Sequence, residues 1–153
     1  MTEIVLKPIG IVRSEVKEHK RGGWQDVTSE IVIDEEWTEH LDGLDEFSHI
    51  MVVFWMHLVP RENRPPMRIH PRGRDDLPLV GLFATRAPYR PNPIGVSVVK
   101  LLHRHDNILT VAGLDAIDGT PVLDIKSYMT PVDKPEDIRM PDWVSKIRTQ
   151  PRS

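Results

Sequence analysis

The segment best suited to chemistry runs from Gly81 to Gly95 and reads GLFATRAPYRPNPIG. It holds three prolines within six residues, and proline fixes its own φ and restricts the residue before it. We therefore expect a rigid loop, suited to an Asn amide and backbone carbonyls that hold a flat heterocycle in one pose. Arg86 and Arg90 could bind a carboxylate or a phosphate through their forked donors. The alternative is a structural proline-rich turn with solvated arginines.

A second polar segment, LDAIDGTPVLDIKSY, runs from Leu114 to Tyr128. Its Asp118-Gly119-Thr120-Pro121 turn is expected to direct backbone N–H groups, a hydroxyl and a carboxylate toward one point. Such a turn can bind a ribose or an ammonium group, although Asp-Gly turns are also ordinary hairpin connectors. Lys126 follows Asp124 by two positions, which puts both on one face of a strand as an expected ion pair.

The charge is sorted along the chain although the net charge is only −3. Eight carboxylates and no lysine or arginine lie between Glu30 and Glu46, whereas seven arginines and three acids lie between His57 and Arg90. The region from Pro60 to Pro93 also holds eight of the 14 prolines. Such an arrangement can give an acidic protein one basic face for RNA or phosphate. Separately solvated loops are an equally good interpretation of the charge alone.

Composition excludes several classes of protein. The 153 residues predict one domain, and no apolar run reaches the length of a membrane span or of a signal-peptide core. The absence of cysteine excludes disulfides, thiolate nucleophiles and Cys-based metal sites. His103 and His105 share a strand face, but no third metal ligand is evident, so no metal is expected. We expect a cytoplasmic protein with no membrane association.

The elements that must position these segments are mostly strands. β-Branched residues in near alternation predict seven of them: Ile4–Val12, Val27–Ile33, His49–His57, Leu79–Ala84, Ile94–Leu102, Asn107–Ala112 and Pro121–Tyr128. The run His49–His57 is apolar throughout, which indicates a strand buried on both faces. One short helix is expected in Glu35–Leu44. The spacing leaves no room for the helices of a doubly wound sheet and no GxGxxG turn is present, so an antiparallel sandwich or barrel is predicted.

Four strings of the sequence resemble the TrmO family, also called TsaA-like or YaeB-like proteins. They are IGIVRS (9–14), GLDEFSHI (43–50), GLFATRAPYRPNPIGVS (81–97) and DGTPVLDIKSY (118–128). The strings occur in the family's order and span nearly the whole chain, and RPNPIG and DGTPVLDIK are long and specific. Ser127 stands where the family usually has proline.

The resemblance implies an all-β fold, a small antiparallel β-barrel of about seven strands with one short helix and a Pro/Arg-rich loop. It implies a homodimer that binds S-adenosylmethionine (SAM) and methylates N6 of N6-threonylcarbamoyladenosine at position 37 of tRNA. The expected SAM-binding barrel domain is 1–130, and 131–153 is an extended tail that could clasp the dimer partner through Trp143. Two alternatives stay open: a non-catalytic SAM- or RNA-binding module, and a methyltransferase of a small molecule.

The resemblance also implies roles for residues. Cofactor residues are expected at the end of the buried strand, in the Asp-Gly-Thr-Pro turn and in two polar loops: Met56, His57, Asp118, Gly119, Thr120, Pro121, Arg86, His19, Lys20 and Arg21. The segment Pro91-Asn92-Pro93 is expected to line the adenine slot, with the Asn92 side chain or a backbone oxygen accepting the N6 hydrogen in a hydrogen bond. Substrate contacts are expected from basic residues: Arg61, Arg64, Arg68, Arg72, Arg74, Arg90 and Lys126. The chain lacks the extra C-terminal domain of two-domain bacterial members, so tRNA would bind the dimer surface alone, or the acceptor is another molecule.

Overall fold

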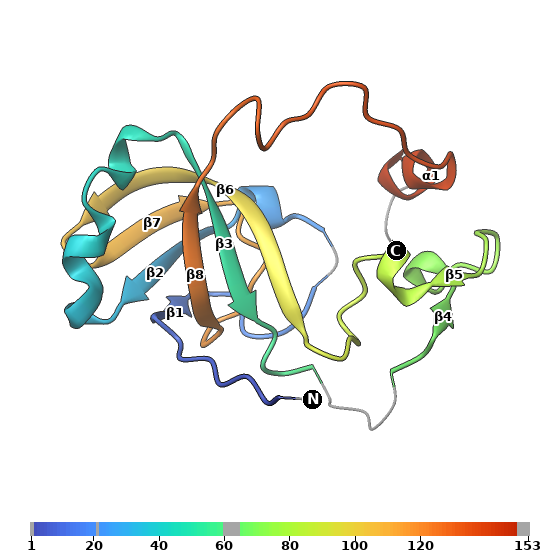
Figure 1. The fold of residues 1–153 in the computed structure, drawn as a ribbon, viewed down its shortest axis with the longest axis horizontal. Helices are drawn as coiled ribbons and strands as arrows, with labels where there is room; N and C mark the ends of the chain where they lie inside the picture. The colour runs from blue at the N-terminus through green and yellow to red at the C-terminus, as the bar shows by residue number, and fades with distance from the viewer. Residues whose placement is uncertain (1, 21, 60–64, 150–153) are drawn as a thin grey trace. The chain divides into compact units, whose positions relative to one another are not determined.

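A computed structural model describes residues 2–20, 22–59 and 65–149. Within these residues, six strands close an antiparallel barrel in the order β1-β2-β7-β6-β3-β8 (Figure 1). The strands are β1 (Gly10–Arg13), β2 (Thr28–Ile33), β3 (His49–Trp55), β6 (Ile94–His105), β7 (Ile108–Ala112) and β8 (Pro121–Ser127). The predicted all-β antiparallel barrel is confirmed.

The chain forms two compact units, which are described separately. The first consists of residues 1–57 and 94–129 and contains the barrel; the second consists of residues 58–93 and 130–153. In the second unit, β4 (Arg68–Ile69) pairs with β5 (Val80–Gly81). This unit also contains the 3-10 helices η4 (Pro71–Gly73) and η5 (Leu82–Ala84) and the helix α1 (Trp143–Thr149).

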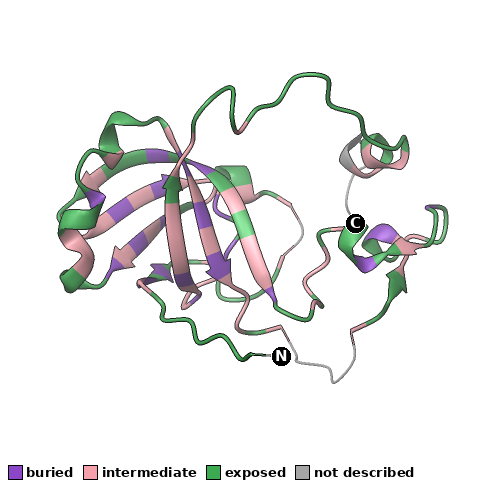
Figure 2. Cartoon of the chain, viewed as in Figure 1, coloured by how far each residue is buried: buried purple, intermediate pink, exposed green. Residues whose placement is uncertain are grey.

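The barrel core is built by strict alternation along its strands. Ile50, Val52 and Phe54 of β3 point inward and are buried, whereas the residues between them are only half-buried (Figure 2). The expectation that β3 is buried on both faces is therefore wrong, because this strand has the barrel interior on one side only. The other strands and the segment before β8 complete the core with Val12, Ile31, Ile33, Val99, Leu101, Leu109, Val111, Leu114, Ala116 and Val122.

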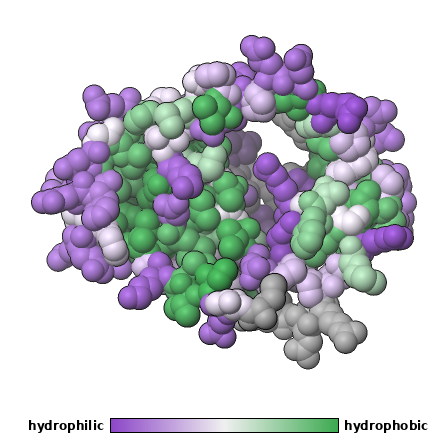
Figure 3. Space-filling view, in the orientation of Figure 1, coloured by the Kyte–Doolittle hydropathy of each residue, from purple (hydrophilic) through white to green (hydrophobic). Residues whose placement is uncertain are grey.

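The outer face of β3 and β6 is also apolar. Val96 pairs with Val53, and Val98 pairs with Met51, so these four side chains share the outward side. Val96 and Val98 are 51% and 47% exposed. Figure 3 shows hydrophobic side chains gathered over the face formed by β3, β6 and β8. Some of the β-branched residues from which β6 was predicted therefore lie on the outer face of the barrel and are not part of its core.

Several predicted boundaries differ from the observed ones. The strand expected from Ile4 begins only at Gly10, because Ile4, Val5 and Leu6 are exposed. The strand expected over 79–84 is β5 followed by η5, and β6 continues three residues beyond Leu102. The expected helix is instead the 3-10 helix η2 (Glu35–Leu41), followed by η3 (Leu44–Glu46), and η1 (Trp24–Asp26) precedes β2.

The C-terminal segment contains a helix where an extended tail was expected. Helix α1 follows Pro141, a residue that cannot continue a preceding helix but is tolerated at the start of a new one. The proposed boundary at residue 130 and the clasp through Trp143 stay predictions. Among the described residues, no helix is long and apolar enough to cross a membrane.

Candidate functional site in the barrel unit

Barrel closure brings together two segments that the sequence predicts to bind the cofactor. Phe54 of β3 pairs with Val122 of β8, so the end of β3 lies beside the turn that precedes β8. A Cβ atom added at Gly119 would lie 3.6 Å from His57 Nε2, and Gly119 has a φ of +84°. Met56 packs against the core. The structure thus places Met56 and His57 next to the Asp118–Pro121 turn.

His57 carries a buried polar atom that the described residues do not satisfy. Its Nδ1 is buried and has no hydrogen-bond partner. Buried nitrogen atoms are nearly always hydrogen-bonded in folded proteins, because burial without a partner costs about 1–3 kcal/mol. An unpaired imidazole nitrogen beside a polar turn fits a site that binds a polar small molecule.

The polar groups of the turn are used within the chain. The N–H of Gly119 donates to Val12 O at 2.8 Å, and both the N–H and the hydroxyl of Thr120 donate to Ile117 O. Thr120 is buried. The expected convergence of these groups on one external point is therefore wrong, because these donors fasten the turn to β1 and to itself. Their contribution to a site is to hold the backbone in place.

Asp118 is held by two donors from the segment after β1. Its Oδ1 accepts a hydrogen bond from the Ser14 N–H, and its Oδ2 accepts one from Lys17 Nζ, both at 2.9 Å. The Lys17 hydrogen bond, followed by that of Ser14, lowers the pKa of Asp118 below its usual value. The carboxylate is therefore ionised throughout the neutral range.

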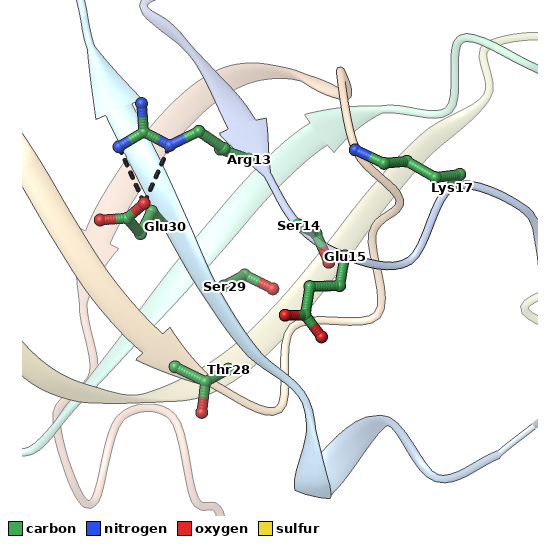
Figure 4. A pocket seen from close by; sticks show the side chains of 7 residues that line it. All are labelled: Arg13, Ser14, Glu15, Lys17, Thr28, Ser29 and Glu30. Atoms are coloured by element: carbon green, nitrogen blue, oxygen red, sulfur yellow. Dashed lines mark hydrogen bonds and ion pairs between the residues drawn. The ribbon is translucent and has the colours of Figure 1, made fainter.

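A polar groove borders this segment where the β1–β2 ladder ends. The last pair of the ladder is Arg13 with Glu30, joined by an ion pair of 2.8 Å. The two strands then separate, and the side chains of the separated ends line the groove together with Lys17 (Figure 4). The lining residues are Arg13, Ser14, Glu15, Lys17, Thr28, Ser29 and Glu30. Ser29 Oγ is buried without a hydrogen-bond partner among the described residues.

Sequence reasoning missed this groove. Its residues form no motif, since they are ordinary serines, a threonine and charged residues on two segments, 13–17 and 28–30. The only usable signal is the hairpin register, which puts Ser14 opposite Ser29 once Arg13 is paired with Glu30.

Lys20 and His19 lie in the loop between β1 and η1. Lys20 Nζ lies 5.0 Å from the centre of the Trp24 ring, and the Trp24 indole N–H donates to Lys20 O. Lys20 is thus used to hold this loop, while His19 is exposed. Arg21 lies outside the described residues.

The predicted catalytic loop belongs to the second unit. Arg90 is half-buried, and its Nη1 donates to Thr85 O at 3.0 Å and to Ala87 O at 3.1 Å. These hydrogen bonds from the guanidinium hold the loop in shape, which agrees with the alternative that this segment is a structural proline-rich turn. Arg86 is exposed and makes no side-chain hydrogen bond or ion pair with any residue that the structure describes. Pro91 and Asn92 are exposed, whereas Pro93 is buried.

The remaining basic residues fall into two groups. Arg68 and Arg72 are exposed in the second unit, and Arg72 adopts a φ of +60°. Arg74 is bound to Asp76, and this hydrogen bond raises the pKa of Arg74 and lowers that of Asp76. Arg61 and Arg64 lie outside the described residues.

On the barrel, the predicted ion pair between Lys126 and Asp124 is confirmed at 3.0 Å. A role of Lys126 in binding substrate stays a prediction. No group of three potential metal ligands occurs among the residues with described positions. His103 Nε2 instead lies 3.1 Å from Thr110 Oγ1 on the neighbouring strand.

Comparison with known proteins gives a consistent result. The model of the tRNA-methyltransferase O N-terminal domain matches residues 15–134. A probable S-adenosyl-L-methionine-binding protein of Methanothermobacter thermautotrophicus is 44% identical over 86% of this chain and 94% of that relative. A putative S-adenosylmethionine-dependent methyltransferase of Pseudomonas aeruginosa, RcsF, is 39% identical over 73% of this chain and 48% of its own length.

Solved structures agree with the sequence comparison. A crystal structure of TrmO from P. aeruginosa matches with a TM-score of 0.75 and 32% identity over 94% of this chain, and another TrmO structure matches with a TM-score of 0.73 and 34% identity. This chain spans 62% and 64% of those two chains. The resemblance found in the sequence is confirmed: the chain belongs to the tRNA-methyltransferase O family, through its N-terminal domain.

Proposed function

We propose that this protein is a SAM-dependent methyltransferase that methylates N6 of N6-threonylcarbamoyladenosine at position 37 of tRNA. The observation that carries the proposal is the junction of His57 with the Asp118–Pro121 turn, in a barrel of the tRNA-methyltransferase O family. The relatives' names support SAM as the cofactor of this family. The unpaired Nδ1 of His57 gives the cofactor a buried polar atom to satisfy.

SAM supplies an activated methyl group, so the residues of the chain need mainly to position two reactants and manage charge. His57 would contact the cofactor, and the fastened turn would form a rigid wall beside it. Arg86, with its unengaged guanidinium, would bind the carboxylate of the methionine part. The side-chain oxygen of Asn92 would accept the hydrogen on N6, which makes that nitrogen a better nucleophile. Pro91 and Pro93 would keep Asn92 in one position.

The second unit would provide the contacts to tRNA. Arg68 and Arg72 are exposed there, and arginine binds phosphate through two parallel hydrogen bonds. A protein that neutralises several phosphates releases counterions, so its affinity for tRNA should fall steeply as salt is raised. A tRNA substrate also places the protein in the cytoplasm.

The outer face of β3 and β6 supports a homodimer. Val96 and Val98 of β6 expose apolar surface, and the Asp124–Lys126 ion pair of β8 lies across β3 from them. A twofold axis through this face would bury the valines and could match the carboxylate of one protomer with the ammonium of its partner.

Two observations favour other functions. Most of the similar proteins are named only as SAM-binding, which favours a non-catalytic module. The net charge of −3 favours an acceptor less acidic than tRNA.

One experiment separates the three functions. The purified protein is incubated with isotopically labelled SAM and threonylcarbamoylated tRNA, and the digested nucleosides are weighed by mass spectrometry. We expect the label on N6-threonylcarbamoyladenosine and none on tRNA that lacks the threonylcarbamoyl group. SAM binding by calorimetry without transfer to RNA would favour the non-catalytic module. Transfer to small molecules in an RNA-depleted extract would favour the third function.

A further inference from the structure

The second unit exposes an aromatic ring that the proposed function has not used. Phe83 is 78% exposed, whereas its neighbour Leu82 in η5 is 5% exposed. Tyr89, six positions later, is 46% exposed. The short helix thus anchors itself through Leu82 and presents Phe83 to solvent. Phe83 and Tyr89 therefore both present aromatic surface to solvent in this segment.

The loop that carries Phe83 is held by its own hydrogen bonds. The Thr85 N–H and the Thr85 hydroxyl both donate to Leu82 O, at 3.0 and 2.7 Å. The Leu82 N–H donates to Met67 O, which ties η5 to the segment before β4. A side chain on such a support loses little conformational entropy when it binds a ligand.

A guanidinium lies over the ring of Phe83. Arg90 Cζ is 5.7 Å from the ring centre, and the two hydrogen bonds of Arg90 to Thr85 O and Ala87 O fix it there. Between residues 77 and 93 the sequence contains no acidic residue, and Arg86 is exposed within the same loop. An aromatic ring, a fixed guanidinium and a neighbouring free cation are the components with which proteins bind single-stranded nucleic acid.

We propose that Phe83, braced by Arg90, is a stacking platform for an unpaired base of the RNA substrate. This inference rests on the proposed function, since it names the part of that function that recognises a tRNA loop. Bases in RNA loops are unstacked and available to aromatic rings, unlike the bases of a duplex. Stacking requires a flat ring and tolerates any base, so the platform contributes affinity without selecting a sequence.

The charge of the loop favours RNA over a protein partner. Residues 77–93 hold two arginines and no acidic residue, and a net positive charge on this loop favours a polyanion such as RNA. A protein partner could bind any apolar side chain of similar volume at position 83, whereas a stacked RNA base needs a flat ring. This difference gives the test.

The test compares Phe83→Leu, which keeps apolar volume, with Phe83→Trp, which keeps a flat ring. The probe is an anticodon stem-loop RNA with one loop adenosine replaced by 2-aminopurine, whose fluorescence is quenched when it stacks. We expect Phe83→Leu to weaken RNA binding by about 5- to 150-fold and to abolish the quenching, as loss of one stacked base does. Phe83→Trp should keep both the RNA affinity and the quenching of the wild-type protein. Phe47→Leu, on a partly exposed phenylalanine of the barrel unit, is the matched control and should change neither.

Three results would overturn the inference. If Phe83→Leu binds the stem-loop as the wild-type protein does, the platform does not exist. If that variant changes the oligomeric state while RNA binding is retained, Phe83 belongs to a protein interface. If the wild-type protein binds neither the stem-loop nor whole tRNA, the proposed function is wrong, and the stacking platform is ruled out with it. This result needs no substitution, so it is distinguishable from a failure of the platform alone. SAM binding measured in parallel shows that each variant is folded.

Discussion

Lys17 Nζ lies 2.9 Å from Asp118 Oδ2, and this ion pair joins the segment after β1 to the turn before β8. These two strands are paired at only two positions, Gly10 with Val122 and Ile11 with Pro121. The contacts of Asp118 therefore extend a short seam at the closure of the barrel. The predicted cofactor turn is part of that seam, so its stability and its geometry are linked.

Asp118→Asn should lower the free energy of unfolding at pH 7, because it removes the charge that Lys17 and Ser14 stabilise. The pKa of Asp118 is lower in the folded protein than its unfolded value of about 3.9. Its contribution is thus present above about pH 4 and is lost as the pH falls through the folded pKa. Urea unfolding should show a larger difference from the wild type at pH 7 than at pH 3, where part of the contribution has been lost. A difference that grows in acid would contradict this. Asp45→Asn, on an exposed aspartate of the same unit, is the control.

Gly95→Ala should lower the free energy of unfolding by about 1–3 kcal/mol, the usual cost of overpacking. A Cβ at this position would lie 2.5 Å from the ring of Phe54, which is buried in the core. Gly81→Ala is the matched control, because a Cβ there meets nothing within 4 Å. Phe54→Leu should recover part of the loss in the double variant. Equal midpoints of thermal unfolding for both alanine variants would contradict this prediction and would show that the Phe54 ring moves aside without a loss of stability.

Arg86→Ala should weaken SAM binding by about 10- to 150-fold, the range for one charge-assisted hydrogen bond. The guanidinium is exposed and has no competing partner among the described residues, so the loss should come from the ligand contact. Calorimetry with SAM measures it, and Arg139→Ala, an exposed arginine of the same unit, serves for comparison. Unchanged SAM affinity with lost tRNA binding would move Arg86 to the substrate.

Asn92→Ala should lower turnover by about 10²- to 10³-fold while SAM binding is retained, if its oxygen accepts a hydrogen bond from the N6–H group. Asn92 is exposed, so the substitution should leave stability nearly unchanged. Single-turnover methylation of threonylcarbamoylated tRNA measures the effect. Pro91→Ala, which loosens the backbone without touching the amide, separates positioning from chemistry. Normal turnover of Asn92→Ala would remove this role.

Val98→Asp should raise the dissociation constant of a homodimer by about 100-fold or more, since it buries an unpaired charge in the interface. Val98 is 47% exposed and opposite Met51 on the outer face. Analytical ultracentrifugation over a range of concentrations measures the change. Val132→Asp introduces the same charge at an exposed valine of the second unit and should have no effect. A wild-type protein that is monomeric throughout would contradict the dimer.

Alternation predicted the barrel strands well where one face is buried. β2, β3, β7 and β8 lie within two residues of the predicted bounds, because each carries regularly spaced core residues. The same rule failed for Ile4, Val5 and Leu6, whose β-branched and aliphatic side chains have no partner strand. It could not find β4, a strand of two residues. Nor could it distinguish a 3-10 helix from an α-helix within the seven residues of η2.

The site was predictable in parts but not as an arrangement. The sequence identified His57 and the Asp-Gly-Thr-Pro turn separately, and the strand order brought them together. β3 and β8 are neighbours in the barrel although β4, η4, β5, η5, β6 and β7 lie between them in the sequence. The fate of the polar groups in the turn was not predictable, because Thr120 and Gly119 donate to carbonyls of Ile117 and Val12 that only the folded chain places in reach.

The pairing of β3 with β6 has a wider consequence. These strands form a regular ladder of seven pairs from His49 with Lys100 to Trp55 with Ile94, and residues 56–93 connect them. A tight hairpin would be enough to close a ladder that ends at Trp55 and Ile94, so the barrel requires only that the two ends of this long connection meet. The entropy cost of closing a loop rises slowly with its length. Outside the segment that carries Arg86 and Asn92, residues could therefore be inserted or removed here at little thermodynamic penalty to the barrel.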